Sequence, residues 1–539
     1  MSSAPPRYST RPKYGPEPSA VNVTLNSLTL SRPRTTETKS SSPVTPYRTA
    51  IIFGLLAAVL AALGSWIPSL WGDEAASLLS AQRPIPSLFS MLGRVDAVHG
   101  TFYLLLHFWL DLVGYTPFNI RLPSAIAVGI TVAGVVILAN RLAGYRTAVV
   151  AGIVCMILPR VTYMGEEARS YALSAACAVW LTIILVRLIG RGELRKSRWL
   201  LYTIVLAVSG YVFLFSLLII ASHAVAVWSA RPNRAVRKAW LLSTIAGVLL
   251  TAPVGIWGFI ERGQISYLST SDAVNFKVIA VDQWFGNANF AIVAWTIIGL
   301  SVIAAVVAVV RIRRKTVSVE DTVLRRQTSG VPSLFAVALS WLVLPVVLLL
   351  CMNAVSAVYT VRYFSFASPA AALLIGLAIA TPSRRWIAPI AIVLLVATAA
   401  PSYLFQRTAY SKNNSDWASD AAVLQVHARA GDAVLFDESA RPSRRPRLAK
   451  YTYPAAFRGL DDIALKTPYT KSATWMDTTY PLTSVLNKLD TVNRVWMIEY
   501  RSPGGTMDTY DLQTLKSLGF AITKEFPEHA SVVLQLDRQ

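Results

Sequence analysis

Residues 51–74 read IIFGLLAAVLAALGSWIPSLWGDE, an apolar run that ends in tryptophan and proline and leads into two adjacent acids, Asp73 and Glu74. A run of about 20 apolar residues is long enough to cross a bilayer as a helix. An ionised acid at bilayer depth costs on the order of 2.5–3.5 kcal/mol, so acids beside a span persist mainly where they do chemistry, bind ions or face water. The pair is therefore the first candidate site, and a solvated loop after the first helix is the alternative.

The composition is that of a membrane protein. Of the 539 residues, 54% are hydrophobic and only 15% are charged, and the mean hydropathy is +0.47, outside the range of soluble globular proteins. The formal net charge of +22 falls largely in short clusters between apolar runs, near Arg191, Arg231, Arg311 and Arg384. Such clusters are typical of cytoplasmic anchors and not of a surface that follows phosphates, so no nucleic-acid partner is expected. The three cysteines predict neither a disulfide framework nor a zinc site.

Charge and parity predict the topology. Residues 1–48 are rich in Ser, Thr, Pro and Arg and are expected to form a disordered cytoplasmic tail. The basic loop 191–198 must also lie inside, so an odd number of spans separates it from Asp73. The shortest apolar run between them, residues 101–113, is therefore expected to lie in the membrane interface, which puts Asp73 and residues 163–169 on the same outer face. The whole chain is then expected to have about 11 spans, with the C-terminus outside the plasma membrane.

From about residue 406 the composition becomes that of a soluble α/β domain. Asp416 is expected to cap a helix that ends near Ala430. The remaining elements are a strand at 433–436, a helix and strand at 482–488 and 495–499, a second pair at 512–518 and 520–523, and a last strand at 531–536. The predicted organisation is thus a tail (1–48), a transmembrane domain (49–405) and an extracytoplasmic domain (406–539). The last is expected either to help bind the acceptor or to act as a structural cover.

The ordered motifs resemble those of the GT-C glycosyltransferases. The nearest branch is that of the protein O-mannosyltransferases and aminoarabinose transferases, of the glycosyltransferase family 39 type. The motifs are Asp73-Glu74 after the first span, His99-Gly100, Arg121-Leu122-Pro123, the run GEEARSY at 165–171 and the run YTVRY at 359–363. The resemblance implies a polytopic α-helical membrane enzyme that uses a polyprenyl-phosphate sugar, with mannose favoured and arabinose next. Members of that branch usually have two prolines after the histidine, where this chain has Gly100-Thr101, so the role of that corner in placing the acceptor stays open.

An inverting transfer from a lipid-phosphate sugar needs a base for the acceptor hydroxyl and a cation for the leaving phosphate. Asp73 is the expected base, because Glu74 together with Glu166 or Glu167 would raise its pKa by like charge. Glu74 is expected to orient or share that proton. Arg362 is expected to bind the donor phosphate through its two-pronged guanidinium. The alternatives are a helix-end acid that faces water for Asp73 and an interfacial anchor for Arg362.

Other polar residues complete the candidate substrate site. Tyr363 is expected beside the donor phosphate, and Arg169 is expected to pair with Glu166 or Glu167. His99 is expected to bind the acceptor or carry a proton, with a structural histidine as the alternative. Asp96 and Tyr171 are the remaining candidates. No cofactor or metal is required: a divalent cation is compatible with these acids, but two carboxylates and a histidine from separate loops do not define a ligand set.

The predicted function is an inverting membrane glycosyltransferase of the outer face. It would move a sugar, mannose first, from a polyprenyl phosphate to a glycan, lipid or protein acceptor of the cell envelope, with the isoprenoid chain in an apolar groove beside membrane lipid. A transporter or flippase for lipid-linked sugars is one alternative, although such proteins typically show repeated halves, which this sequence does not. A catalytically inactive scaffold that presents the outer domain is the other.

Overall fold

The computed structural model describes residues 45–539 except 266–267, 269–273, 315–329, 383, 385 and 502–504. The predicted disordered tail lies almost wholly outside the described residues, as does the basic stretch that follows residue 314. These segments are left out of the description below.

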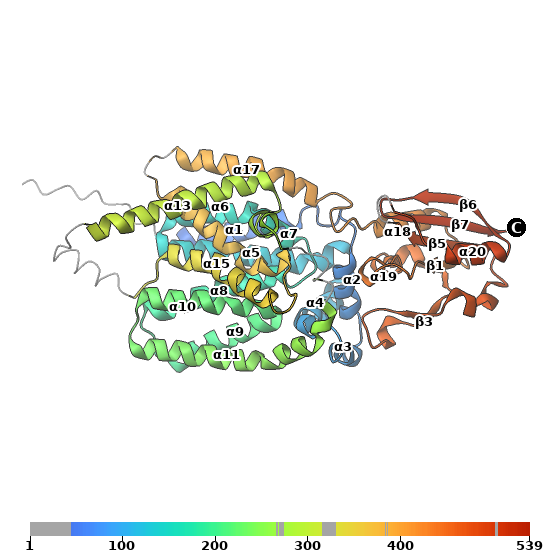
Figure 1. Cartoon of the computed structure of the whole chain (residues 1–539), viewed down its shortest axis with the longest axis horizontal. Coiled ribbons are helices and arrows are strands. Elements are labelled where there is room, and N and C mark those ends of the chain that lie inside the picture. The colour runs from blue at the N-terminus through green and yellow to red at the C-terminus, as the bar shows by residue number, and fades with distance from the viewer. Residues whose placement is uncertain are drawn as a thin grey trace, which may run out of the picture. The chain divides into compact units, whose positions relative to one another are not determined.

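Eight helices of the described chain are long and apolar enough to cross a membrane. They are α1 (Thr45–Ala62), α5 (Pro117–Ala143), α8 (Tyr171–Gly190), α11 (Arg234–Ile260), α13 (Ala288–Arg314), α15 (Leu334–Asn353), α16 (Ser368–Ala380, after the 3₁₀ turn Val361–Ala367) and α17 (Ile387–Gln406). A ninth span is formed if α6 (Tyr145–Ile157) and α7 (Pro159–Gly165), which meet at 59°, count as one. Figure 1 shows these helices bundled side by side. The predicted polytopic helical membrane fold is confirmed.

A shorter helical hairpin completes the bundle. It consists of α9 (Lys196–Val212) and the apolar segment Leu214–Ala230, which contains α10 (Ile219–Ala230). α9 is shorter than a spanning helix and Leu214–Ala230 is one of the shorter apolar helices, so the described chain has eight or nine candidate spans and the number 11 remains a prediction. The turn lies at 213–218 and not at the predicted Ser209-Gly210. Ser209 stays in α9, where its hydroxyl lies 2.8 Å from that of Ser216.

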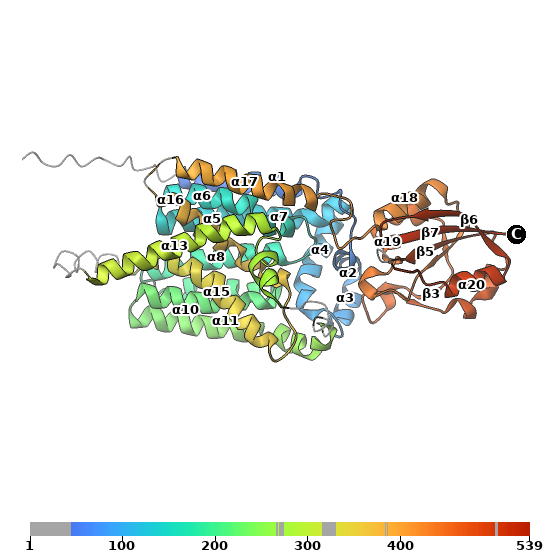
Figure 2. The same ribbon diagram turned by 45° about the horizontal axis from the view of Figure 1, so that its top comes forward.

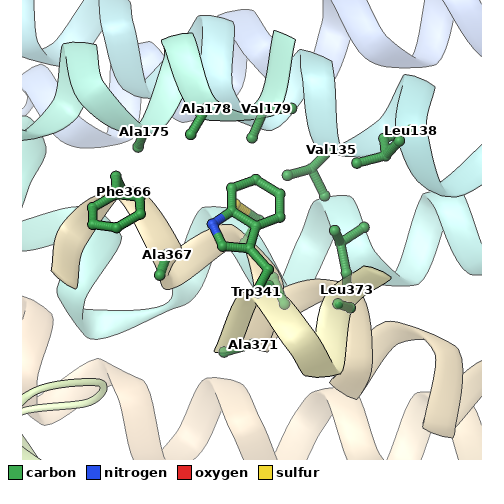
Figure 3. Close-up of a cluster of buried hydrophobic side chains, with 14 of the residues drawn as sticks. Val135, Leu138, Ala175, Ala178, Val179, Trp341, Phe366, Ala367, Ala371 and Leu373 are labelled. Carbon is green, nitrogen blue, oxygen red and sulfur yellow. The ribbon is translucent and has the colours of Figure 1, made fainter. Parts of the chain in front are cut away.

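Small residues allow the spanning helices to pack closely. Gly54 of α1 and Gly129 of α5 lie back to back, and a Cβ atom on Gly129 would come within 2.6 Å of the Gly54 carbonyl oxygen. Where α5, α8, α15 and α16 meet, Trp341 is fully buried beside Val135 and Leu373 (Figure 3). Close packing of this kind holds membrane helices together where lipid offers no hydrophobic drive.

Three short helices lie at one end of the spans, between them and the C-terminal strands (Figures 1 and 2). They are α2 (Gly72–Ala81), α3 (Ile85–Leu92) and α4 (Gly100–Val113). α2 and α3 are separate helices, because Pro84 lacks the N–H that would continue α2. The apolar stretch Ala97–Val113, which includes α4, is shorter than the spanning helices. Its place in the membrane interface remains a prediction.

The C-terminal part contains a five-stranded mixed sheet in the order β2-β1-β5-β7-β6. Its strands are β1 (Ala433–Phe436), β2 (Asp461–Asp462), β5 (Arg494–Tyr500), β6 (Phe520–Pro527) and β7 (Ser531–Arg538), and a separate ladder joins β3 (Leu465–Thr467) and β4 (Thr478–Thr479). The accompanying helices are α18 (Trp417–His427), α19 (Leu448–Thr452) and α20 (Tyr510–Ser517). β1 runs parallel to β2 and β5, whereas β7 is antiparallel to β5 and β6. The predicted small α/β region is confirmed.

Two local expectations about the C-terminal part are wrong. The helix expected at 482–488 is a pair of 3₁₀ turns, Leu482–Ser484 and Leu486–Leu489, in a stretch where Thr483 and Val485 are weak helix formers. The Asp416 side chain does not cap α18. It accepts hydrogen bonds from the Ala530 amide at 2.5 Å and the Ser531 hydroxyl at 3.0 Å, and so holds the start of α18 to β7.

The C-terminal part contacts the short-helix layer through polar bonds. The Leu70 amide donates to the Tyr453 hydroxyl at 3.0 Å, and Arg83 donates to the Ser472 carbonyl at 3.1 Å. The contact is closest at Gly72, where a Cβ atom would come within 2.3 Å of the Ser443 carbonyl oxygen. Only glycine therefore fits at the first residue of α2 with the C-terminal part in this place.

The predicted orientation can be tested with single cysteines. Ser197, in the first turn of α9, and Thr483 are both exposed. In a chain whose three native cysteines are replaced, an impermeant thiol reagent should label Thr483→Cys in intact cells and spare Ser197→Cys, because the basic loop is held inside. Both positions should react after the membrane is permeabilised. Labelling of Ser197→Cys alone in intact cells would reverse the topology.

Candidate active site

The first turn of α2 carries the two acids that the sequence singled out, and it aims them apart. Successive side chains on a helix point about 100° from one another, so neighbours do not share a cavity. Glu74 points inward, where its carboxylate makes a bidentate pair with Arg121 of α5 at 2.7 and 2.5 Å, and both side chains are fully buried. Its Oε1 also accepts a hydrogen bond from the Ala168 amide at 3.0 Å. Glu74 thus joins α2, α5 and the loop before α8.

Asp73 faces two arginines. Its Oδ2 accepts a hydrogen bond from Nη1 of Arg362 and lies 3.5 Å from Nη2 of Arg169. The Asp73 and Arg362 side chains each keep 20% of their surface exposed, and the Arg362 guanidinium lies 4.9 Å from the ring centre of Trp71. Burial opposes ionisation of Asp73, but Arg362 and Arg169 outweigh it and lower its pKa to about 2. Asp73 is therefore a carboxylate at neutral pH.

These contacts correct three expectations. Glu74 does not share a proton with Asp73, because Arg121 and the Ala168 amide occupy its carboxylate. Arg169 does not pair with Glu166 or Glu167, but with Asp73. The pKa of Asp73 is lowered and not raised, because two arginines lie closer to it than any of the other acids.

The two acids of the loop after α7 have separate environments. Glu166 is fully buried and lies 3.2 Å from Lys412 and 3.3 Å from Arg407, which both belong to the segment after α17. Glu167 is 1% exposed and lies 3.7 Å from Nη1 of Arg362. Within the described chain neither carboxylate oxygen of Glu167 has a hydrogen-bond partner. Glu167 therefore remains available as an acceptor beside the Asp73–Arg362 pair.

One cavity beside the pair is cationic; we refer to it as the cationic cavity. It has a volume of about 530 Å³ and is lined by Arg362, by Arg160 and by one acid, Asp282, whose carboxylate is bound by Lys277 at 2.7 Å. Aromatic and apolar groups form much of the remaining wall, namely Tyr163, Phe285, Val361, Pro401 and Phe405. Such a cavity can hold a phosphate at its arginines and an apolar chain along its wall.

A second cavity, the apolar cavity, lies on the other side of the same turn. It has a volume of about 770 Å³ and is lined by the ends of α11 and α15 and by the turn before α10. Three predicted site residues, Asp96, His99 and Tyr363, lie in its wall. Tyr363 stacks on Phe215 at 5.0 Å, so it faces away from the phosphate site in which it was expected. Arg362 and its neighbour Tyr363 thus line different cavities.

A hydrogen-bond chain connects the apolar cavity to Asp73. The Tyr103 hydroxyl donates to Asp96 at 3.1 Å and accepts from Arg169 at 3.1 Å, and Arg169 pairs with Asp73. Burial and Arg169 lower the pKa of His99 to about 3, so its imidazole is neutral at neutral pH. Its Nδ1 has no hydrogen-bond partner within the described chain. The predicted residue Asp96 therefore reaches the site through Tyr103 and Arg169, whereas His99 lies beside Tyr103 at 6.0 Å between ring centres.

Other residues have supporting places or were missed. Tyr171 is buried edge-on against Phe213, at 5.6 Å between ring centres, and packs the start of α8. Sequence patterns did not single out Arg160, Lys412 or Tyr103. Arg160 directly follows a proline inside an apolar run, which is the one signal that marked it. The described residues contain no group of three His, Cys, Asp or Glu side chains that could hold a metal ion.

Comparisons with known proteins agree with this architecture. A family model described as dolichyl-phosphate-mannose-protein mannosyltransferase matches residues 101–257. The crystal structure of ArnT from Cupriavidus metallidurans bound to undecaprenyl phosphate aligns with a TM-score of 0.54 at 12% identity, over 90% of this chain and 97% of that chain. The chain has the same fold as ArnT. The apo ArnT structure aligns over 92% of this chain and 98% of that one, with a TM-score of 0.53 at 12% identity.

No curated protein matches the chain. At 12% identity, the likeness to ArnT is one of fold.

The Glu74–Arg121 pair should matter for stability. Glu74→Gln keeps the size of the side chain but leaves a buried guanidinium without its counter-charge, which costs about 3–5 kcal/mol. Thermal unfolding of the purified protein in detergent should therefore begin at a lower temperature than for the parent. Asp73→Asn is the matched control, because it changes the adjacent acid at a partly exposed position. Equal unfolding temperatures for the two variants would contradict the structural role of Glu74.

Proposed function

We propose that this protein is an inverting membrane glycosyltransferase that moves a sugar from a polyprenyl phosphate to an acceptor hydroxyl at the outer face. The proposal rests on one observation: Arg362, which forms an ion pair with Asp73, lines the cationic cavity, and the next residue, Tyr363, lines the apolar cavity. A base and a phosphate-binding cation are then in contact at the point where donor and acceptor would meet.

The cationic cavity suits the donor. Arg362 and Arg160 would face the phosphate, and the apolar wall formed by Phe285 and Phe405 would take the first part of the isoprenoid chain. The undecaprenyl phosphate bound by ArnT, which has the same fold, supports a donor of this chemical class. The carboxylate of Glu167, which lies 3.7 Å from Arg362 but has no hydrogen-bond partner in the described chain, would accept hydrogen bonds from sugar hydroxyls beside the phosphate.

Donor binding would also prepare the base. Without a donor, Arg362 keeps the pKa of Asp73 at about 2, and a carboxylate with this pKa is a weak base. A donor phosphate would compete with Asp73 for the Arg362 guanidinium. As Arg362 turns to the phosphate, Asp73 loses its strongest cationic partner and its pKa rises towards the ordinary range. The base would therefore become effective only when a donor is present.

The chemical step then balances simply. Asp73 takes the proton of the acceptor hydroxyl, and the acceptor oxygen forms a bond to the anomeric carbon. The bond from that carbon to the phosphate oxygen breaks, and the polyprenyl phosphate leaves with the electron pair and is held by guanidinium groups. Attack from the opposite side inverts the anomeric configuration. No metal takes part in this scheme.

The acceptor would arrive through the apolar cavity. Asp96 and the neutral His99 lie in its wall, and Tyr103 and Arg169 link Asp96 to Asp73. These groups can bind hydroxyls of a glycan, a glycolipid or a protein of the cell envelope. The family resemblance favours mannose as the sugar and arabinose next. Residues 49–405 would form the catalytic domain, and residues 406–539 would form an outer domain that holds the short helices over the site.

Two variants distinguish the role of Asp73 as the base from the role of Arg362 as the phosphate-binding cation. Asp73→Asn removes the proton acceptor, so the single-turnover rate should fall by roughly 10²–10⁴-fold. Donor affinity should stay equal or become tighter, because Arg362 is released from Asp73. Arg362→Ala should instead weaken donor binding by about 1.5–3 kcal/mol, the value of a charge-assisted hydrogen bond. Radiolabelled polyprenyl-phosphate mannose and arabinose, offered with a panel of envelope acceptors, would measure both quantities.

Asp111→Asn serves as the matched acid control for this experiment. Asp111 lies on α4 with 71% of its side chain exposed, and its neutralisation should leave the rate and the donor affinity unchanged. An Asp73→Asn protein that transfers sugar at the parent rate would remove Asp73 from the role of base. Donor binding without transfer to any acceptor in the panel would favour a carrier of lipid-linked sugars.

A further inference from the structure

Arg160 owes its place to a break in a membrane helix. Pro159 interrupts the run between α6 and α7, and Leu158 adopts the extended conformation that a following proline favours. The axes of the two helices therefore meet at 59°, and Arg160 falls in the first turn of α7 at the wall of the cationic cavity. Its residue surface is only 8% exposed.

The guanidinium of Arg160 is held by neutral groups. Its Nε donates to the Gln283 carbonyl at 3.1 Å, and its Nη2 donates to the Asp282 carbonyl. The loop that supplies these carbonyls is itself fixed, because the Tyr359 hydroxyl donates to Oε1 of Gln283 at 2.7 Å. The guanidinium is therefore oriented in advance, but none of these bonds balances its charge.

Arg160 differs in this respect from the other buried arginines of the site. Arg121, Arg169, Arg362 and Arg407 each have a carboxylate oxygen within 4.0 Å, whereas Arg160 has none in the described part of the chain. The acids whose charges reach it are engaged elsewhere. Glu167 lies 3.7 Å from Arg362, and the Asp282 carboxylate is bound by Lys277 at 2.7 Å. The excess positive charge of the cationic cavity is thus that of Arg160.

A buried charge without a counter-charge is costly unless a ligand supplies one. The partner must be an anion that fits a planar fork, and phosphate is such a ligand. We propose that Arg160 is the principal phosphate-binding cation of the cationic cavity, with Arg362 as the second; this deepens the proposed function and rests on it. Arg362 must give up Asp73 to bind phosphate, whereas Arg160 has no acid to give up.

The assignment predicts that Arg160 prefers polyprenyl monophosphate, which is released from the donor, to the intact donor. A sugar phosphate linked to a polyprenol carries one negative charge, whereas the released polyprenyl monophosphate carries about 1.5–2 at pH 7. Charge therefore develops on the leaving group as the bond breaks, and two guanidinium groups stabilise it better than one. Arg160 should contribute more to the binding of polyprenyl monophosphate than to the binding of the intact donor.

The test measures binding of polyprenyl monophosphate to the full-length protein in detergent. Arg160→Gln should weaken binding by about tenfold to a hundredfold, as expected for loss of a charged hydrogen-bonding partner. Arg160→Lys keeps the charge without the fork and should fall between this variant and the parent. Arg146→Gln is the matched control, because it removes an exposed arginine from α6 of the same bent pair and should bind as the parent does.

Two further ligands separate charge from structure and lipid from free phosphate. A neutral polyprenol should bind equally to the parent and to Arg160→Gln, and an equal loss for alcohol and phosphate would overturn the proposal. Inorganic phosphate should compete with the lipid for binding to the parent and should no longer compete with it for binding to Arg160→Gln. If inorganic phosphate competes equally in both, the anion site lies elsewhere.

The outcomes also distinguish this inference from the function on which it rests. If polyprenyl monophosphate binds the parent and Arg160→Gln with the same affinity, the role of Arg160 is wrong while the donor class stands. If the parent does not bind the lipid at all, the proposed function fails. If Arg160→Gln does not fold, Arg160→Lys and inorganic phosphate still decide. The assignment would be overturned if Arg160→Lys bound polyprenyl monophosphate with the affinity of the parent and inorganic phosphate did not compete with the lipid for the parent.

Discussion

The geometry of the site depends on one buried ion pair, that between Glu74 and Arg121. Both side chains are inaccessible to solvent, and the bidentate contact fixes the first turn of α2 against α5. Because the Ala168 amide binds the same carboxylate, the loop that carries Glu167 and Arg169 is anchored at the same point. Asp73 is the residue before this anchor, so its direction follows from a contact in which it takes no part.

Around this anchor, acids and cations are matched over long distances in the chain. Asp73, Glu166 and Glu167 each have a cationic partner from another segment, and the partners lie up to 289 residues away in sequence. Isolated ions next to lipid would be costly, whereas paired ions with good geometry are tolerated. The matching is incomplete at Arg160, which is why that arginine stands out as a ligand site. In the described part of the site, Arg160 is the buried arginine without a carboxylate within 4.0 Å, and this charge would attract an anion to the cationic cavity.

Much of the fold could be predicted because it depends on local patterns. Apolar length and basic loops identified the spanning helices, and a short continuous apolar run after Gly431 placed the strand at Ala433–Phe436 with its correct ends. The site was harder to predict. Asp73 and Glu74 are equivalent as a sequence pair, and only the position of Arg121 shows that one is structural. Arg169 was expected to pair with Glu166 or Glu167, three and two positions before it, yet cations from distant segments lie beside both of these acids. In the sequence, Arg160 is only an arginine that follows a proline. Its place at the cationic cavity becomes clear only from the bend between α6 and α7.

The contact of Glu166 with Lys412 and Arg407 bears on how the protein can be divided. The composition changes at residue 406, where α17 ends, and a designer of chimeras would cut the gene there. Such a cut would remove both cations from a fully buried acid. The boundary between the two parts therefore lies after Lys412, because the segment between α17 and α18 carries cations that pair with an acid of the membrane part. Exchange of C-terminal modules between proteins of this architecture is then constrained to keep that short basic segment with the spanning helices.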